Sequence, residues 1–284
     1  MTQASATLRD LLDAGARRLA AAGLPDPRRE AVRIWTGLDG RPPADRLLLR
    51  ETEVDSRART RFDLAVDRRL AGEPLAYVTG WTGFRHLDLR CDRRALIPRP
   101  ETEGLVDLAL ECCPEGRAAD IGTGTGCLAL SLAFEGRYDA VLAVDRSAPA
   151  LELAAENAHL TGQRVTFLNG DLSLALGPAS LDLLVSNPPY LTRDEYAALD
   201  PAVRAWEPGP ALVSGPDGLE ATRRLLEDGL RVLRPGGWIL LELDSTRAVP
   251  TAQLAAAAGW AAPQVRDDLF GRARYLIARR SQWK

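Results

Sequence analysis

The chain has 284 residues, of which 46% are hydrophobic and 26% charged, and it carries a formal net charge of −3. This balance is ordinary for a globular protein and excludes a disordered chain, a collagen and a coiled-coil rod. It also argues against direct binding of nucleic acid over a wide face, because gripping duplex phosphates calls for a basic surface.

Signals for export or for membrane insertion are not recognisable in the sequence. No apolar run approaches the roughly 18 residues of a membrane span, and the first five residues lack the basic and apolar regions of a secretory signal. We therefore expect a cytoplasmic protein with reduced thiols and no membrane partner. We expect no metal either, because the two histidines and four cysteines include no C-x-x-C pair. The cysteines are Cys91, Cys112, Cys113 and Cys127.

Residues 1–75 are predicted to form a small bundle of helices. Apolar residues recur there with the helical spacing of about 3.6 residues, and turn residues separate the segments. The expected helices are one capped by Thr7 and ended near Gly23, one after Asp26, one around residues 47–49, and one from Asp55 or Ser56 to Gly72. This domain either docks a large protein substrate or serves only stability.

Residues 76–98 are predicted to form a linker built on a β-hairpin. Gly80 and Gly83 supply turns, and apolar residues alternate from Leu87 to Cys91. Prolines on both sides of Arg99 fix an extended loop. A helix is expected to follow, from about residue 102 to residue 112.

From residue 117 onwards strands alternate regularly with helices, which predicts an α/β domain over residues 99–284. Such alternation is typical of a doubly wound, mostly parallel sheet, here with seven strands. The expected strands cover residues 118–121, 140–144, 165–168, 181–186, 238–243, 264–266 and 274–279, the last two as an antiparallel pair. The expected helices cover residues 128–134, 148–160, 218–232 and 246–258.

A glycine-rich loop follows the first of these strands. Its residues are Asp120, Ile121, Gly122, Thr123, Gly124, Thr125 and Gly126. Glycine lets a ligand approach the backbone without obstruction by a Cβ atom. The spacing is G-x-G-x-G and not the G-x-G-x-x-G of dinucleotide sites. The loop alone is compatible with two interpretations: it binds a nucleotide-like ligand, or it allows tight packing of the strand against the helix.

Two acids follow the next two strands. Asp145 ends the strand after the glycine loop, where a carboxylate can accept both ribose hydroxyls of a nucleoside. It could equally cap the helix that follows, and the two roles are compatible. Asp171, after the third strand, could accept from an adenine amine or be an ordinary loop residue.

A rigid polar turn directly after the strand at 181–186 is the most specific motif. It consists of Asn187, Pro188, Pro189 and Tyr190. The two prolines make the turn rigid. The Asn187 side chain and the Pro188 carbonyl offer two acceptors, and Tyr190 offers a flat face, which together suit a planar NH2 group.

Together these motifs resemble class I S-adenosylmethionine-dependent methyltransferases that act on a planar nitrogen. Four further segments are similar to the protein glutamine methyltransferase family that modifies peptide-chain release factors, and the resemblance covers essentially the whole chain. These segments are residues 72–80 (Gly-Glu-Pro-Leu-Ala-Tyr-Val-Thr-Gly), 96–103 (Leu-Ile-Pro-Arg-Pro-Glu-Thr-Glu), 217–219 (Asp-Gly-Leu) and 268–272 (Asp-Leu-Phe-Gly-Arg).

The resemblance implies methyl transfer from S-adenosylmethionine to the side-chain amide nitrogen (N5) of the glutamine in a release factor's Gly-Gly-Gln loop. The substrate would be held by Asn187, Pro188, Pro189 and Tyr190, with catalytic roles for Asn187, Pro188 and Tyr190. The expected cofactor-binding residues are Asp120, Gly122, Thr123, Gly124, Thr125, Gly126, Asp145, Asp171, Leu172 and Asn187. We expect a monomer whose partner is the release factor.

Two positions depart from the family pattern. Leu172 stands where the family usually has an aromatic residue, which weakens one stacking contact to adenine, and Asp244 stands where it often has glycine. Arg99 and Glu101 either shape a cofactor lid or pair with each other. The alternative functions are an adenine N6-methyltransferase on DNA or RNA, a ribosomal-protein glutamine methyltransferase, and a non-enzymatic adapter that merely holds a nucleoside.

Overall fold

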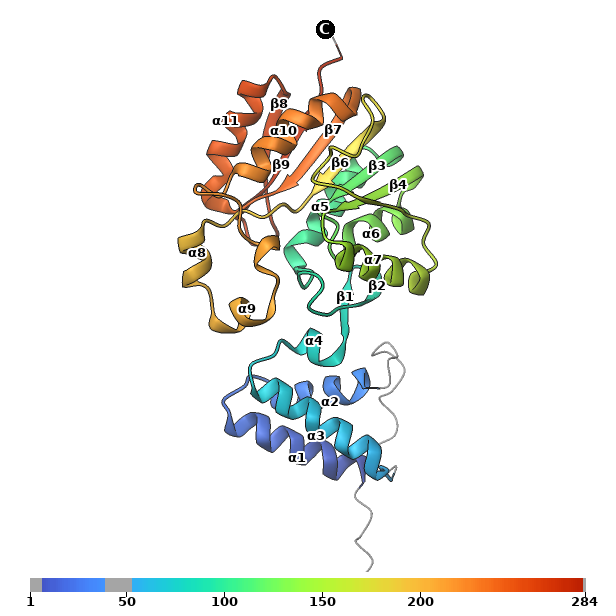
Figure 1. The fold of residues 1–284 in the computed structure, drawn as a ribbon, viewed down its shortest axis with the longest axis vertical. Helices are drawn as coiled ribbons and strands as arrows, with labels where there is room; N and C mark the ends of the chain where they lie inside the picture. The colour runs from blue at the N-terminus through green and yellow to red at the C-terminus, as the bar shows by residue number, and fades with distance from the viewer. Residues whose placement is uncertain (1–6, 39–52, 283–284) are drawn as a thin grey trace, which may run out of the picture. The chain divides into compact units, whose positions relative to one another are not determined.

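The computed structural model describes residues 7–38 and 53–282 (Figure 1). The chain divides into two compact units: Met1–Thr82 with Pro201–Trp206, and Gly83–Asp200 with Glu207–Lys284. The boundaries predicted from the sequence, at residues 75 and 98, stay a prediction. No helix within the described ranges is long and apolar enough to cross a membrane.

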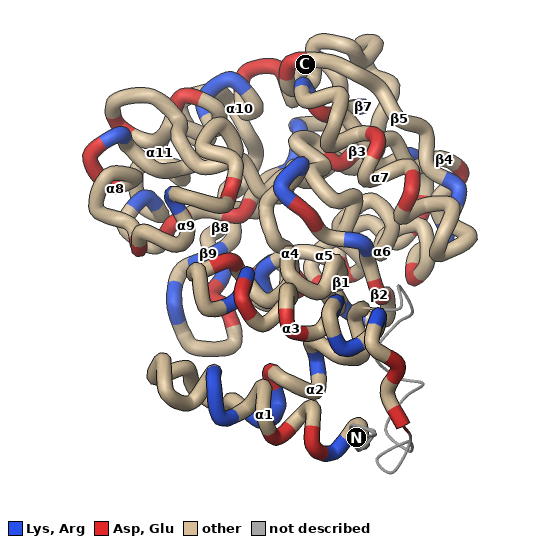
Figure 2. Tube along the Cα trace, turned by 60° about the horizontal axis from the view of Figure 1, so that its bottom comes forward, with Lys and Arg blue, Asp and Glu red and all other residues tan. Residues whose placement is uncertain are grey.

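The first unit contains the helices α1 (Leu8–Ala21), α2 (Pro27–Gly37) and α3 (Ser56–Leu70). The predicted cap is present: the Thr7 side chain accepts from the Asp10 backbone, and the Asp10 carboxylate accepts from the Thr7 backbone in return. The helix expected around residues 47–49 lies outside the described residues. Charges of both signs lie along α1 (Figure 2).

The apolar faces of these helices meet in one cluster, so the predicted periodicity is confirmed. The buried members are Leu8, Leu11, Leu12, Leu19, Ala31, Ile34, Phe62, Ala65, Val66 and Val78. A half-buried ion pair between Arg69 on α3 and Glu30 on α2, at 2.8 Å, lies beside this core. The unit is therefore held mainly by apolar burial.

The predicted linker contains a helix that the sequence analysis missed. Helix α4 covers Leu75–Thr79, with Pro74 at its start and Gly80 at φ +76° at its end. The glycine that the sequence analysis assigned to a hairpin turn is thus a helix C-cap. The hairpin is correspondingly shorter than expected, with strands β1 (Trp81–Phe84) and β2 (Leu87–Arg90).

The second unit contains the predicted seven-stranded sheet, in the order β5-β4-β3-β6-β7-β9-β8. The five strands from β5 to β7 are parallel, and β9 runs antiparallel to both β7 and β8. The strands are β3 (Glu115–Ile121), β4 (Arg137–Asp145), β5 (Thr166–Asn169), β6 (Leu181–Ser186), β7 (Leu233–Glu242), β8 (Ala261–Asp267) and β9 (Ala273–Arg279). The parallel strands place their carboxyl ends at one edge.

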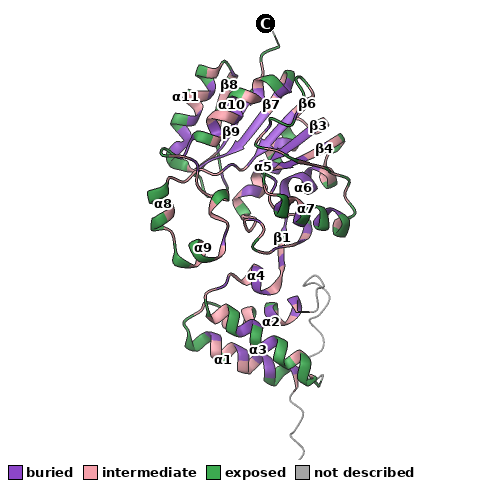
Figure 3. Ribbon diagram, in the orientation of Figure 1, coloured by how far each residue is buried: buried purple, intermediate pink, exposed green. Residues whose placement is uncertain are grey.

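Helices cover both faces of this sheet, which is largely buried (Figure 3). Successive side chains of a strand point to opposite faces, so Leu184 of β6 joins one core while Leu183 and Val185 join the other. Helices α10 (Glu220–Val232) and α11 (Ala248–Ala258) pack in the first core. Helices α5 (Pro100–Cys112) and α6 (Cys127–Glu135) pack in the second, and α7 (Ala148–Thr161) lies against β4 and β5.

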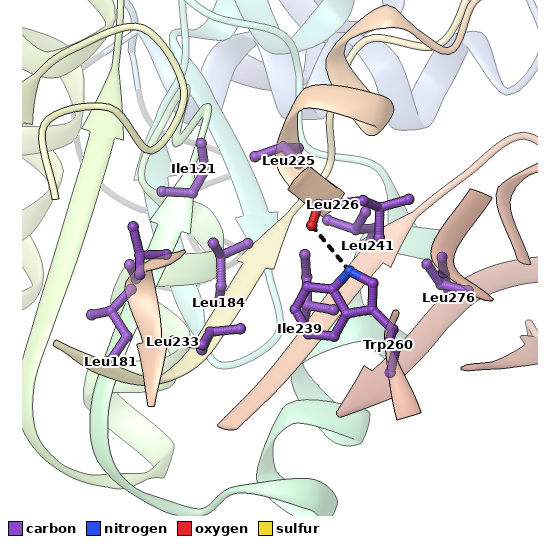
Figure 4. Packing of buried hydrophobic residues seen from close by; sticks show 14 of the residues in the cluster. Ile121, Leu181, Leu184, Leu225, Leu226, Leu233, Ile239, Leu241, Trp260 and Leu276 are labelled. Carbon is purple, nitrogen blue, oxygen red and sulfur yellow. Dashed lines mark hydrogen bonds between the residues drawn. The ribbon is translucent and has the colours of Figure 1, made fainter. Parts of the chain in front are cut away.

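The first core is closed by a buried tryptophan. The Trp260 indole N–H donates to the Leu226 carbonyl of α10 at 3.0 Å, among Leu225, Ile239 and Leu241 (Figure 4). Burial of the ring contributes on the order of 2–3 kcal/mol, and the hydrogen bond removes the cost of hiding its one polar group. This packing fixes α10 against β7.

The segment between β6 and α10 contains short helices that the sequence analysis did not predict. They are α8 (Arg193–Ala198), α9 (Pro201–Trp206) and the 3₁₀ helix η2 (Gly209–Ala211). Every residue of α8 and α9 is half-buried or exposed, so the sequence carries no apolar stripe to reveal them. A Thr192–Glu195 capping box starts α8.

Candidate active site

A cavity of about 730 Å³ lies at the carboxyl edge of the sheet, within the second unit. Such an edge is where open α/β sheets bind their ligands. Several residues that the sequence analysis selected line it: Gly122, Gly124, Asp145, Asp171, Leu172, Asn187 and Pro189. The motifs that follow β3, β4, β5 and β6 therefore meet in one place.

The glycine loop uses its glycines for two different purposes. Gly122, Gly124 and Gly126 all have positive φ, at +74°, +56° and +84°. A Cβ atom on Gly122 would meet nothing within 4 Å, so its backbone is open to a ligand. A Cβ on Gly126 would lie 3.1 Å from Leu130 and 3.2 Å from Ala154, so this glycine serves helix packing. Both interpretations of the loop therefore apply, each to a different residue.

Asp120 lies beneath the loop, and the described cavity lining does not include it. Its carboxylate accepts from the Thr123 hydroxyl at 2.6 Å and from the Ala129 backbone at 3.2 Å. Its second oxygen, Oδ1, has no hydrogen-bond partner among the described residues. Complete burial raises the pKa of Asp120 to about 7. The residue holds the loop, and Thr123 and Thr125 are buried with it.

Asp145 is positioned by the loop that it faces. One carboxylate oxygen accepts from the Gly124 N–H and the other from the Ser147 N–H, both at 2.9 Å. The cap of α7 is Ser147, whose side chain accepts from Ala150, and not Asp145. A carboxylate has about four acceptor sites, so each oxygen retains one for a ligand hydroxyl.

The loop after β5 contributes Asp171 and Leu172 to the cavity wall. The Asp171 carboxylate accepts from Arg224 at 2.6 Å through Oδ2 in an exposed position, which leaves its other oxygen for a ligand amine. Leu172 has φ +51°, a left-handed conformation that is uncommon for leucine. Its side chain packs on the core and lines the cavity.

The turn after β6 is anchored at its start by two side-chain hydrogen bonds. The Ser186 hydroxyl donates to the Ile121 carbonyl at 2.6 Å, which ties β6 to β3. The Asn187 side-chain N–H donates to the Thr102 hydroxyl of α5 at 3.1 Å. Pro188 is buried and Tyr190 half-buried, and burial raises the pKa of the Tyr190 phenol. Of the described residues of the turn, Asn187 and Pro189 line the cavity, while Pro188 and Tyr190 do not.

The Tyr190 backbone explains the Asp-Gly-Leu motif at residues 217–219. Gly218 has φ +74°, and a Cβ atom there would lie 2.3 Å from the Tyr190 carbonyl oxygen. The Arg247 guanidinium is nearly as close and donates to the Asp217 carbonyl at 3.2 Å. Only glycine lets this loop pass so near the end of the turn.

Of the two alternatives for Arg99 and Glu101, pairing with each other is wrong, and a role in a cofactor lid stays a prediction. Arg99 pairs with Glu207 instead, at 2.7 Å, and the Glu207 carboxylate also accepts from the Ile97 backbone at 3.4 Å. The partner lies 108 positions further along the chain, so the sequence did not reveal it. This ion pair fixes the proline-rich loop before α5.

Sequence reasoning also missed Thr102 and four arginines. Four arginines line the cavity but lie far apart in a sequence rich in arginine: Arg94, Arg146, Arg193 and Arg224.

Asp244, where the family often has glycine, accepts from the Thr246 backbone at 2.9 Å and starts a 3₁₀ turn before α11. The substitution is therefore accommodated by a cap.

The cavity suits a nucleoside. Gly122 presents bare backbone, Asp145 retains acceptor capacity for two hydroxyls, and Leu172 offers an apolar surface. The volume of about 730 Å³ lies within the range of small-molecule sites. These features fit S-adenosylmethionine.

Comparison with known proteins identifies the family. Residues 10–80 match the model of the PrmC N-terminal domain, and residues 103–202 match the methyltransferase small domain. The release factor glutamine methyltransferase of Deinococcus radiodurans is 43% identical over 281 residues, which cover 96% of this chain and 99% of that protein. The enzyme of the same name from Nitratidesulfovibrio vulgaris is 40% identical over 283 residues, or 97% and 96% of the two chains.

Among solved structures, a methyltransferase from Pyrococcus furiosus matches with a TM-score of 0.52 at 19% identity, covering 80% of this chain and all of that one. This likeness supports the fold alone. The predicted class I methyltransferase fold and the expectation of an S-adenosylmethionine-dependent methyltransferase are confirmed. The chain belongs to the release factor glutamine methyltransferase family.

Proposed function

We propose that this enzyme methylates the side-chain amide nitrogen of the glutamine in the Gly-Gly-Gln loop of peptide-chain release factors. The observation that carries the proposal is the anchored amide of Asn187. Because its N–H group is engaged by Thr102, its carbonyl oxygen is the atom left for a ligand. A second carbonyl, that of Pro188, follows directly in the rigid turn.

We assign the cofactor-binding role to the glycine loop and the acids that follow it. Gly122 and Gly124 bring the backbone close, Asp145 accepts the ribose hydroxyls, and Leu172 packs on the base. Asp120, Thr123, Thr125 and Gly126 act indirectly, by holding the loop. Asp171 accepts from the base through the carboxylate oxygen that Arg224 does not engage. When bound, S-adenosylmethionine supplies a methyl group activated by a sulfonium.

The turn residues orient and polarise the substrate amide. An amide nitrogen is a weak nucleophile because its lone pair is delocalised into the carbonyl. Asn187 Oδ1 and the Pro188 carbonyl each accept one N–H of the glutamine, which favours pyramidal nitrogen and stabilises the positive charge that develops there. Correct orientation of reactants can supply roughly 7–11 kcal/mol of the barrier. Pro189 and Tyr190 keep the amide flat in the site.

The finer organisation follows from the same assignment. Residues 1–75 dock the release factor, and residues 99–284 carry out the methyl transfer. Residues 76–98 link these two domains. The enzyme acts as a monomer, in the cytoplasm where translation terminates. The helical unit suits a docking role because its described helices carry many exposed charges, including Arg17, Arg59 and Asp67.

A methyl-transfer assay with three acceptors side by side tests the function. The acceptors are release factor, ribosomal protein and duplex DNA, each with radiolabelled S-adenosylmethionine. We expect label on the release factor only, and its loss when the Gly-Gly-Gln glutamine is replaced by alanine. Label on the DNA or ribosomal protein, with none on the release factor, would overturn the proposal in favour of the corresponding alternative.

A further inference from the structure

Behind the Asn187 amide lies a buried polar pair that the proposed chemistry does not yet use. Thr102 is the third residue of α5, and Glu242 is the last residue of β7. Only 3% of Thr102 and 2% of Glu242 is exposed to solvent. The Thr102 hydroxyl accepts from Asn187 at 3.1 Å, and it lies near enough to the Glu242 carboxyl group to lower the pKa of that group. The Glu242 Oε2 atom has no hydrogen-bond partner among the described residues.

The chemistry of a hydroxyl group decides where the Thr102 hydrogen points. A threonine hydroxyl has one hydrogen to donate. Since Thr102 accepts from the Asn187 amide, that hydrogen is free to go to Glu242. An ionised Glu242 accepts only, and so requires this direction. The Asn187 amide must then present N–H to Thr102 and its oxygen, Oδ1, away from it.

Close packing holds Thr102 at the required place. The Tyr275 hydroxyl of β9 donates to the Glu101 carbonyl in the first turn of α5. A Cβ atom on Gly104 would lie 2.4 Å from that hydroxyl oxygen, so only glycine admits the contact. Tyr275 is the register partner of Glu242 across β7 and β9. The start of α5 and the end of β7 are thus positioned by the same residue.

We propose that Glu242 and Thr102 are positioning residues that select the orientation of the Asn187 amide in which Oδ1 is offered to the substrate. This inference rests on the proposed function, because it concerns the group that would hold the glutamine. Neither residue needs to touch the substrate. An inverted Asn187 would offer N–H to the substrate's N–H and would repel it.

Protonation of Glu242 reverses the arrangement. A neutral carboxyl can donate to Thr102, whose hydrogen then turns to Asn187 and favours the inverted amide. Burial raises the pKa of Glu242 to about 7, while the Thr102 hydrogen bond and the charge of Arg274 oppose the rise. The other groups that face it are Glu101, Arg99, Tyr190, Tyr275 and Cys127. Turnover should therefore fall on the acid side of about pH 7.

The first test compares two substitutions of one residue. Thr102→Val keeps the shape but removes the hydroxyl, whereas Thr102→Ser keeps the hydroxyl. We expect Thr102→Val to lower kcat on release factor by about 10-fold or more, and Thr102→Ser to stay within about 2-fold. Binding of S-adenosylmethionine by calorimetry should be unchanged in both. Equal kcat in the two variants would overturn the proposal.

The second test uses pH and does not depend on Thr102→Val folding. Wild type should lose kcat below about pH 7, and Glu242→Gln, which cannot ionise, should show a flat profile. The side-chain amide resonances of Asn187, followed by NMR in the full-length chain, should shift with the same midpoint in wild type and not in Glu242→Gln. Persistence of both pH effects in Glu242→Gln would contradict the inference.

The NMR titration also separates this inference from the proposed function. If the release factor is not methylated but the Asn187 resonances titrate as expected, the substrate assignment fails and the positioning pair stands. If the release factor is methylated but the resonances show no Glu242-dependent shift, the positioning pair fails and the function stands.

Discussion

The loop after β3 and the turn after β6 face the same cavity but are held in different ways. The glycine loop is fixed mainly by backbone: Gly122 and Thr123 donate to the Val144 carbonyl at 2.8 and 3.1 Å, and three glycines have positive φ. The turn is fixed by side-chain hydrogen bonds, from Ser186 to the Ile121 carbonyl and from Asn187 to Thr102. Substitution should therefore damage binding and stability in the first region and turnover in the second.

The largest effect should come from Asn187→Ala. Loss of one acceptor aimed at the developing charge should lower kcat by about 10² or more. Single-turnover assays on release factor measure this change. The melting temperature should stay near that of wild type, because the side chain is only half-buried. Turnover close to wild type would contradict the role assigned to the turn.

Asp145→Ala should act on cofactor binding. Removal of a charged acceptor of two hydroxyls should weaken the affinity for S-adenosylmethionine by about 10- to 100-fold, corresponding to about 1.5–3 kcal/mol. Isothermal titration calorimetry measures this directly. Saturating cofactor should restore most of kcat, which distinguishes the variant from Asn187→Ala. An unchanged dissociation constant would refute the ribose assignment.

A matched pair of glycine substitutions should separate packing from ligand approach. Gly126→Ala meets Leu130 and Ala154 as well as an unfavourable φ, so we expect it to cost about 2–4 kcal/mol of unfolding free energy. A Cβ atom on Gly122 would meet no neighbour, so Gly122→Ala should lower the unfolding free energy only by the cost of its positive φ, about 1–2 kcal/mol. It should also weaken cofactor binding. Chemical denaturation and calorimetry measure the two quantities. A Gly122→Ala protein less stable than Gly126→Ala would contradict this assignment.

An effect that is confined to stability should appear in its pH dependence. Asp120 has a pKa of about 7 when folded against 3.8 ordinarily, so the folded state binds the extra proton between these values. Its contribution to stability is therefore complete below about pH 4 and is lost as pH rises through about 7. Asp120→Asn should flatten this decline, since its amide oxygen can still accept from Thr123. Denaturation at pH 5 and pH 8 measures the slope, and an equal slope in both proteins would contradict the assignment.

The sequence was sufficient to predict an element wherever a clear hydrophobic periodicity or a local motif specified it. The β6 strand was predicted at its exact bounds, and the antiparallel end pair was expected. Helices α8 and α9 were missed because they carry no apolar stripe, and α4 because its glycine cap resembles a hairpin turn.

The groups that support the site could not be predicted, because their partners are distant in sequence. Asn187 and Thr102 are 85 positions apart, and Arg99 and Glu207 are 108 positions apart. Only the register of β3, β6 and β7 brings Asn187 and Glu242 to the same edge. Motifs identified the residues that would touch ligands, whereas those that position them required the fold.

A crystal structure of the enzyme with S-adenosylhomocysteine and a Gly-Gly-Gln peptide would test the central claim most directly. The account predicts that the glutamine NH2 group donates to Asn187 Oδ1 and to the Pro188 carbonyl, with its nitrogen facing the cofactor's sulfur. A glutamine held by other groups, with the Asn187 turn directed away from the sulfur, would contradict it.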